Sequence, residues 1–402
     1  MSTEILKFEQ FVKAPPPQVY QAFTNATLLK EWCCDVATVD PKPGGRLYMS
    51  WNEGFYTSGE YTALEKDKSI AFTWRGRADP GQTKVDVNLL ESDDGTQIKL
   101  IHSDIGSGPE WKATTQEFQR GWENGLKNLV SVLESGEDLR FVMRPMLGIT
   151  LTDFNEEIAK QLGVPVTKGI RIDGTVDGMG AQAAGLEKDD VIVSMNGKPA
   201  DDFPLLTSAL TGLRAGDTTE VIFYRGLEKK TIMMELSRRP IPDIPDTTAE
   251  LSQALEKKYL EVEPQLNEFL DGITEEDANY KPSPDDWSVK EVLAHLIQGE
   301  RFYQFYIAEL VGGQERWSDD YAGNLEASIE ATVASNPSLY DLREALNRAR
   351  KETVLLIAKL PVEFVERKGS YWRLGYGALE GQFHDTAHIE QMKTAVEAAR
   401  SQ

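Results

Sequence analysis

The hydrophobic pattern of this 402-residue chain changes its period along the sequence, and no single fold accommodates all of it. From Gly44 onward, short segments such as RLYMSW, SIAFTWRG and TQIKLIHSD follow one another with the period of strands and are separated by turn signals such as Asp94-Gly95. Helical stretches follow much later, near 247–271, 288–311, 338–360 and 377–400. The sequence therefore predicts three domains, about 1–138, 141–239 and 247–402, which a chain of this length can contain.

Net charge and cysteine content exclude several classes of partner. The net charge of −22 repels phosphate backbones, so we expect neither nucleic acid nor an anionic membrane as a partner. No apolar run approaches the length of a membrane span, and the opening MSTEILKFEQ lacks the features of a secretory signal. Cys33 and Cys34 are adjacent and would bridge only with strain, which favours a reduced, cytoplasmic protein. Ordinary burial of these cysteines is expected, and a reactive or metal-binding pair is the alternative.

Three of the four histidines are spaced so that one metal ion could collect them. His384 and His388 are four apart in GQFHDTAHIEQM, a pattern typical of a helix, and so lie on one helical face. His295 follows the capping-box pattern of Ser288 and Glu291 in WSVKEVLAHL and points inward. Three imidazoles without a fourth protein ligand indicate an open site for a divalent transition metal. The alternative is that each ring makes an ordinary hydrogen bond.

The C-terminal segment resembles a known family. WSVKEVLAHL, followed about ninety residues later by H-x-x-x-H-x-x-Q, is similar to the DinB/YfiT-like family over residues 247–400. The resemblance implies a four-helix bundle with an ion near one end, held by His295, His384 and His388 and followed by Gln391. Zinc or nickel is the expected metal. Family members with assigned activities include thiol-dependent transferases, isomerases and hydrolases, and many have none, so a metal-dependent hydrolase or thiol-dependent transferase is one expectation. Glu300 and Asp385 are the nearest acids in sequence, and neither is a decisive general base.

The first domain combines a strand, a helix beginning at Pro15–Pro17, several strands and a long amphipathic helix. This order predicts an α+β helix-grip architecture. The segments APPPQVYQAFTNATLLKEW, PGGRLYMSW and GWENGLKNLVSVLE resemble the SRPBCC superfamily, in the branch similar to the Hsp90 ATPase activator (AHSA1-type). The resemblance implies a cavity between sheet and helix that can hold an apolar small molecule.

Tryptophans are the candidate lining of that cavity, with core filling as the alternative. The candidates are Trp32, Trp51, Trp74 and Trp122. His102 lies in a strand beside Ser103 and Asp104. Because neighbouring strand residues point to opposite faces, we expect a structural histidine and not a catalytic triad.

The middle domain alternates short strands with one compact helix near 203–212. It resembles a PDZ domain of the circularly ordered type, through Leu147-Gly148-Ile149, Ala181–Leu186, Asp190-Val191-Ile192 and Asn196-Gly197. Two departures from the family, Met179-Gly180 and Asp189, fall in turns.

The resemblance implies capture of peptide or protein C-termini. The carboxylate loop maps to Met146, Leu147 and Gly148, the pairing strand begins at Ile149, and Leu206 and Leu210 line the side-chain pocket. Arg144 could add positive charge near the carboxylate. The alternative is a PDZ fold that serves only as a spacer or internal docking module. No serine-protease triad accompanies the segment, so an HtrA-type protease is not expected.

Two further segments bear on function. The proline-rich SRRPIPDIPDTTAE reads as a semi-rigid linker before the bundle. GSYWRLGYG could form a flap over the metal end, or its Tyr371, Trp372 and Tyr376 could pack in the bundle. Together these features predict a metal-dependent enzyme with binding modules. The alternatives are a non-enzymatic adaptor or stress-response protein that captures peptides and apolar ligands or clients, and a chaperone-associated protein.

Overall fold

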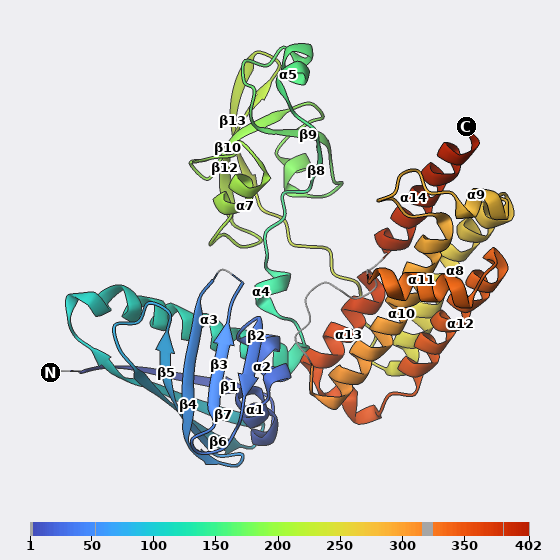
Figure 1. The fold of residues 1–402 in the computed structure, drawn as a ribbon. Coiled ribbons are helices and arrows are strands. Elements are labelled where there is room, and N and C mark those ends of the chain that lie inside the picture. Colours follow the sequence, from blue (N-terminus) through green and yellow to red (C-terminus); the bar gives the residue numbers. More distant parts are fainter. Residues whose placement is uncertain (1–2, 53, 316–324, 381, 402) are drawn as a thin grey trace. The chain divides into compact units, whose positions relative to one another are not determined.

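The computed structural model describes the chain except at residues 1–2, 53, 316–324, 381 and 402, and it describes only the backbone of residues 382–384 (Figure 1). Residues 1–138 and 242–402 form one compact unit, and residues 139–241 form another. The predicted fold class is confirmed: a helix-grip domain, a small β-rich domain and an all-helical bundle follow one another. The predicted boundaries of 1–138, 141–239 and 247–402 stay a prediction.

The N-terminal domain is a seven-stranded antiparallel sheet with helices packed against it (Figure 1). Its strands lie in the order β1-β7-β6-β5-β4-β3-β2, so the chain meanders from β2 to β7 and closes against β1. The strands are β1 (Thr3–Val12), β2 (Val36–Val39), β3 (Arg46–Ser50), β4 (Tyr56–Glu65), β5 (Ser69–Gly76), β6 (Thr83–Ser92) and β7 (Gly95–Gly106). The helices are α1 (Pro16–Thr24), α2 (Ala26–Trp32), η1 (Pro109–Trp111) and α3 (Lys112–Ser135).

Helix α3 covers the sheet because its apolar residues recur on one face. Phe118, Trp122, Leu126 and Leu129 are buried along that face and join the core of the domain. The helix ends at Gly136, whose φ of 83° suits a residue without a side chain.

The middle domain is built on a sheet in the order β13-β12-β10-β9-β8, with β11 paired to β10. Its strands are β8 (Ile149–Thr152), β9 (Ile170–Thr175), β10 (Val191–Met195), β11 (Lys198–Pro199), β12 (Thr218–Arg225) and β13 (Glu228–Glu235). Its helices are α4 (Leu139–Val142), α5 (Glu156–Leu162), α6 (Gly180–Ala183) and α7 (Phe203–Ala209). Strand β8 is an edge strand, which leaves one side of its backbone without a partner strand.

The C-terminal region is helical throughout its described part. Its helices are α8 (Thr248–Asp271), α9 (Glu275–Asn279), α10 (Val289–Gly312), α11 (Glu326–Ser335), α12 (Leu339–Ala358), η2 (Val362–Glu366), α13 (Lys368–Glu380) and α14 (Gln382–Arg400). Helix α10 begins with the predicted capping box of Ser288 and Glu291. None of the described helices combines the length and the apolar composition that crossing a bilayer requires.

The expectation of a flap is wrong. The GSYWRLGYG segment lies in helix α13, where Tyr371 and Trp372 are buried. The Tyr371 hydroxyl donates to the carbonyl of Pro245 at 2.8 Å, and the rings of Trp372 and Tyr376 stack at 5.2 Å. Tyr371 is therefore bundle packing, the alternative that the sequence left open. Trp372 faces the N-terminal domain, since a Cβ added at Gly136, at the end of α3, would lie 2.6 Å from the Cβ of Trp372.

Within the first unit, the N-terminal domain contacts the bundle through the loop and helix at Asn25–Trp32. The Asn25 amide donates to the carbonyl of Gly313 at 3.0 Å, and the backbone N–H of Glu315 donates to the Thr27 hydroxyl at 2.8 Å. The Lys30 ammonium lies 3.0 Å from the Glu315 carboxylate. Each of these contacts is directional, so they fix α2 against the end of α10.

Glu31 is buried in the same contact. Its carboxylate accepts from the Ser370 hydroxyl, and it fits because Gly369 has no side chain: a Cβ there would lie 2.4 Å from Glu31 Oε2. Removal from water raises the pKa of Glu31 to about 7, against the opposing effects of Arg373, Ser370 and Arg367.

This raised pKa predicts a pH dependence of stability. Between its ordinary pKa of 4.5 and its folded value of about 7, the folded chain binds a proton at Glu31 that the unfolded chain has lost. Stability contributed by Glu31 should therefore fall as the pH rises through that range. We expect the urea midpoint of the wild type relative to that of Glu31→Gln to fall as the pH rises from 4.5 to 7.5, whereas the midpoint relative to the exposed Glu9→Gln stays constant. A constant difference between Glu31→Gln and the wild type over that range would contradict the prediction.

Candidate metal centre and peptide groove

Two of the three predicted metal-ligating imidazoles meet in the bundle. His295 on α10 is 8% exposed, and its ring centroid lies 4.8 Å from that of His388 on α14. Trp287 lies just before the start of α10, and its ring centroid is 5.0 Å from that of His295. Two imidazoles brought this close from separate helices fit a shared ion.

The third predicted ligand, His384, lies on α14 one turn before His388, and its side chain is outside the described residues. Among the residues that the structure describes, no three His, Cys, Asp or Glu side chains form a metal-binding group. The trio of histidines therefore stays a prediction, supported by the one pair that the structure places.

His388 is oriented by a neighbour on its own helix. Its Nδ1 lies 2.8 Å from Oε1 of Gln391, the glutamine that the family pattern places there. An amide oxygen only accepts, so Nδ1 donates in this hydrogen bond, which leaves Nε2 of the neutral ring as the nitrogen that could ligate a metal. An outer hydrogen bond of this kind fixes the ring orientation of a metal-ligating histidine.

The two nearest acids both have partners. The Glu300 carboxylate accepts from the Tyr259 hydroxyl at 2.8 Å and from the Thr353 hydroxyl at 2.7 Å, and burial raises its pKa. Asp385 accepts from Arg350 at 3.1 Å. Sequence reasoning missed Arg350, Tyr259 and Thr353. Polar residues at inward-facing helical positions were the signal that could have found them.

His102 is a structural histidine, as predicted. Trp122 Nε1 donates to its Nδ1 at 3.0 Å, so its Nε2 donates to the Thr83 hydroxyl at 2.7 Å, which in turn donates to the Trp74 carbonyl at 3.1 Å. The ring is fully buried, and burial lowers its pKa to about 3. The Ser103 hydroxyl points instead to the carbonyl of Lys84.

Replacing His102 should reveal the contribution of its hydrogen bond with Trp122 and the effect of its lowered pKa on stability. His102→Phe leaves the Trp122 N–H without an acceptor, so we expect a loss of roughly 1–3 kcal/mol at pH 7.5. The folded chain holds His102 neutral while the unfolded chain protonates it below about 6.5, so the stability of the wild type relative to His102→Phe should fall as the pH falls. Urea unfolding followed by tryptophan fluorescence at pH 7.5 and 5 gives the free energy of unfolding of both proteins. The difference between wild type and variant at each pH removes the contribution of Glu31, which both proteins share. An unchanged pH dependence in the variant argues against the assigned role.

The predicted apolar cavity is small in this structure. Trp32, Trp74 and Trp122 are buried in the core, and Trp51 is half-buried and donates to the carbonyl of Cys33. One space between sheet and helices, near Trp32 and Trp122, has a volume of about 10 Å³. That volume holds about one water molecule, so an apolar ligand would require the core to open. Ligand binding there stays a prediction.

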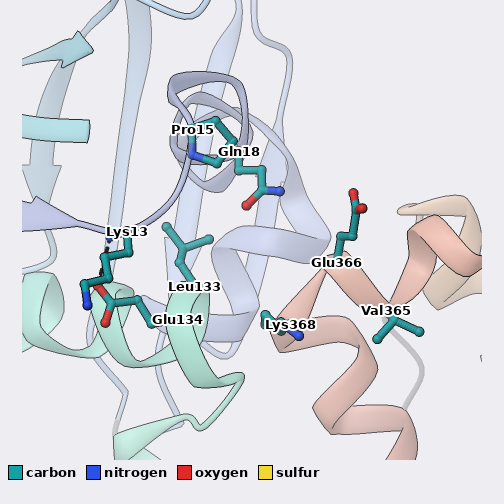
Figure 2. Close-up of a pocket in the computed structure, with 8 residues that line it drawn as sticks. All are labelled: Lys13, Pro15, Gln18, Leu133, Glu134, Val365, Glu366 and Lys368. Carbon is teal, nitrogen blue, oxygen red and sulfur yellow. Dashed lines mark hydrogen bonds between the residues drawn. The ribbon is translucent and has the colours of Figure 1, made fainter. Parts of the chain in front are cut away.

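A larger pocket, of about 450 Å³, opens on the surface between α1, α3 and the start of α13 (Figure 2). Its lining includes Lys13, Glu134, Glu366 and Lys368, so its charges balance. The backbone N–H of Lys13 donates to Glu134 at 2.9 Å. The pocket contains none of the residues that the sequence predicted for a site.

The predicted carboxylate loop of the middle domain presents unused donors. The carbonyl oxygens of Leu147 and Gly148 accept from the N–H groups of Ala181 and Val176, at 3.0 Å and 2.8 Å. Throughout the described part of the chain, no protein group accepts from the N–H of Leu147 or of Gly148. Two adjacent free N–H groups at the start of an edge strand suit a carboxylate.

The other predicted groove residues have different roles. Met146 exchanges two hydrogen bonds with Ser237, at 2.9 Å and 2.8 Å, which anchors the loop. Ile149 and Leu210 are half-buried against the domain core, and Leu206 lies within it. Leu151 on β8 and Phe203 and Leu205 on α7 are exposed apolar side chains of this domain, which the sequence analysis did not single out.

The departure at Asp189 has a local explanation. Asp189 adopts a φ of 70°, a conformation in which glycine is favoured, and its carboxylate accepts from Arg171 at 2.6 Å. The ion pair holds the turn in place, and the turn lies away from the free N–H groups of the loop.

Comparison with known families assigns each of these parts. Residues 13–134 match the model described as Activator of Hsp90 ATPase homolog 1-like protein, residues 145–236 match the PDZ domain, and residues 259–392 match the DinB superfamily. The chain therefore contains an AHSA1 domain, a PDZ domain and a DinB-superfamily domain.

Relatives among curated proteins match only a part of the chain. Periplasmic serine endoprotease DegP of Escherichia coli is 35% identical over 94 residues, which are 23% of this chain and 19% of DegP. Periplasmic pH-dependent serine endoprotease DegQ of the same organism is 33% identical over 79 residues, 20% of this chain and 17% of DegQ. The chain thus spans about a fifth of the length of the curated relatives it matches.

Solved structures similar to the chain include the Aha1 dimer from Colwellia psychrerythraea and an HSP90 activator from Plasmodium falciparum. The first is 20% identical with a TM-score of 0.29, covering 33% of this chain and 96% of its own. The second is 24% identical with a TM-score of 0.28, covering 32% and 95%. At TM-scores this low, the likenesses add nothing to the domain assignment.

Proposed function

We propose that the DinB-superfamily domain holds a divalent transition metal, zinc or nickel, at His295, His384 and His388, and acts as a metal-dependent hydrolase or thiol-dependent transferase. The observation that carries the proposal is the 4.8 Å approach of the His295 and His388 rings from separate helices. A metal with open coordination positions lowers the pKa of a bound water or binds a thiolate.

The chain's own residues suit this role. His295 is held in the buried N-terminal half of α10, between Val292 and Leu296, so its ring has little freedom to move. Gln391 fixes the orientation of the His388 ring from the outside. Both features preorganise nitrogen ligands before any metal arrives.

Metal content tests the centre directly. We expect purified full-length protein to carry close to one equivalent of zinc or nickel by elemental analysis, and His388→Ala or His295→Ala to lose it. Gln391→Ala should weaken binding by about 10–100-fold, because it removes the group that orients His388. His102→Phe, which removes the histidine of the other domain, is the matched control and should keep the metal.

Equal metal content in His388→Ala and the wild type would sink the proposal. So would a wild type that binds neither zinc nor nickel after titration of the metal-free protein.

We further propose that the PDZ domain captures C-terminal peptides along β8. The free N–H groups of Leu147 and Gly148 support this, because they would receive the terminal carboxylate while the peptide pairs with the edge strand. Gly148 has a φ of 76°, and a Cβ there would lie 2.3 Å from the Cβ of Met179. The loop therefore depends on glycine at this position.

A pair of glycine variants distinguishes an effect on the carboxylate loop from the general backbone strain of placing alanine at a positive φ. Gly178 has the same φ of 76°, and a Cβ added to it would meet nothing within 4 Å. We expect Gly148→Ala to weaken binding of a fluorescent peptide ending in a free valine carboxylate by at least about tenfold, and Gly178→Ala to leave it unchanged. The amide of the same peptide should bind weakly to all three proteins in fluorescence anisotropy. Equal binding of acid and amide would rule out carboxylate capture.

A non-enzymatic adaptor is the second candidate function, and the free N–H groups of Leu147 and Gly148 at the start of the edge strand β8 are the observation that favours it. In that case the PDZ domain selects a partner, the AHSA1 domain binds an apolar ligand or client, and the metal has a structural role. The net charge of −22 argues against nucleic acid and anionic membranes as partners of either function.

We propose the cytoplasm as the compartment, because Cys33 and Cys34 are both free thiols. The names of the curated relatives make the periplasm the alternative.

A further inference from the structure

The apolar core of the bundle is divided in two. One cluster contains Leu266, Val292, Leu346 and Met392, and the other contains Leu255, Ile307, Ile357 and Leu374. Between the two clusters, every long helix contributes polar side chains, which we call the polar layer. Its members are Lys258 and Tyr259 on α8, Glu300 and Gln304 on α10, Arg350 and Thr353 on α12, and Asp385 on α14.

Most of the polar layer is internally satisfied. Tyr259 and Thr353 both bond the Glu300 carboxylate, and the Gln304 amide donates to the Thr353 hydroxyl and to the carbonyl of Ala349, each at 3.1 Å. Lys258 donates to the carbonyl of Ala378 at 3.1 Å. A buried polar network is stable only when its members find partners in this way.

Arg350 is the exception. It is 5% exposed, its guanidinium lies 5.0 Å from the centre of the Tyr259 ring, and one nitrogen donates to Asp385 at 3.1 Å. Its Nε is buried and has no hydrogen-bond partner among the residues that the structure describes. A guanidinium has five N–H donors, so a single bond leaves a buried cation with unused capacity. In a native protein such a group is explained by a water, an ion or a ligand that binds it, by strain or by a catalytic task.

Arg350 is linked to the helix that carries two of the predicted metal ligands. Its partner Asp385 is next to His384 in sequence and three residues before His388, so one turn of α14 connects the guanidinium to the histidines. A molecule whose reacting group reached the histidines could place a second group on Arg350.

We propose that Arg350 binds the carboxylate of a small-molecule ligand whose other end reaches the histidine site, an inference that rests on the proposed metal centre. The planar guanidinium offers parallel donors that match a carboxylate. The polar layer already contains two carboxyl side chains, Glu300 and Asp385, and two cations, Lys258 and Arg350. A singly charged carboxylate adds less buried negative charge than a phosphate, so the charge count favours the carboxylate.

Isothermal titration of the full-length protein with propionate tests the inference, at constant ionic strength with chloride as the reference salt. We expect saturable binding to the wild type, binding at least tenfold weaker in Arg350→Met, and an intermediate loss in Arg350→Lys. Arg343→Met is the matched control, since Arg343 lies on the same helix and pairs with Asp271 at the surface. It should bind propionate as the wild type does.

Three results would overturn the inference: no propionate binding beyond that of chloride, unchanged binding in Arg350→Met, or inorganic phosphate binding as tightly as propionate. If Arg350→Met does not fold, the Nε–H signal of Arg350 in ¹⁵N-arginine-labelled wild type, assigned by its absence in Arg350→Lys, replaces it. A shift of that signal with propionate supports the proposal, and an unmoved signal rejects it.

The same titration separates this inference from the proposed metal centre. Propionate binding that persists in metal-free His388→Ala supports a carboxylate site at Arg350 whatever the metal content shows. Protein that holds metal but does not bind propionate contradicts the Arg350 site alone.

Discussion

Charged and hydroxyl side chains are buried in the middle of the C-terminal bundle, and their need for partners determines how its helices meet. Glu300 is bonded from α8 and α12 at once, and Arg350 joins α12 to α14. Because hydrogen bonds tolerate little change in distance or direction, this layer sets the register of the helices more narrowly than apolar packing does. The approach of His295 on α10 to His388 on α14 depends on that register.

Buried polar groups also join the bundle to the AHSA1 domain. Glu31 sits among Ser370, Arg367 and Arg373, and Glu315 takes two bonds from Arg373, both 2.9 Å long. The PDZ domain differs, since residues 139–241 form a compact unit with an apolar cluster of their own. A change in α2 is therefore a change to both domains of the first unit, whereas the loop at Leu147 and Gly148 can be altered within its own unit.

Local signals predicted the elements well. Ser288 and Glu291 marked the start of α10, and the apolar stripe through Phe118 and Trp122 predicted α3, because caps and periodicity act within a few residues. The flap was not predicted correctly, because the helix found there depends on a contact with a distant part of the chain. Its glycines and aromatic residues read as a loop, but Tyr371 is buried against a segment more than a hundred residues away, at Pro245, and that contact is not encoded locally.

By itself, the sequence determined three modules, the shared face of His384 and His388, and the inward direction of His295. Periodicity reports which side of a helix faces the core, so these conclusions needed no partner. Only the tertiary structure decided that the His295 ring meets the His388 ring, that Glu300 and Asp385 are already engaged, and that Arg350 keeps an unused donor. What lies opposite a buried side chain depends on how separate helices pack, and no spacing within one helix contains that information.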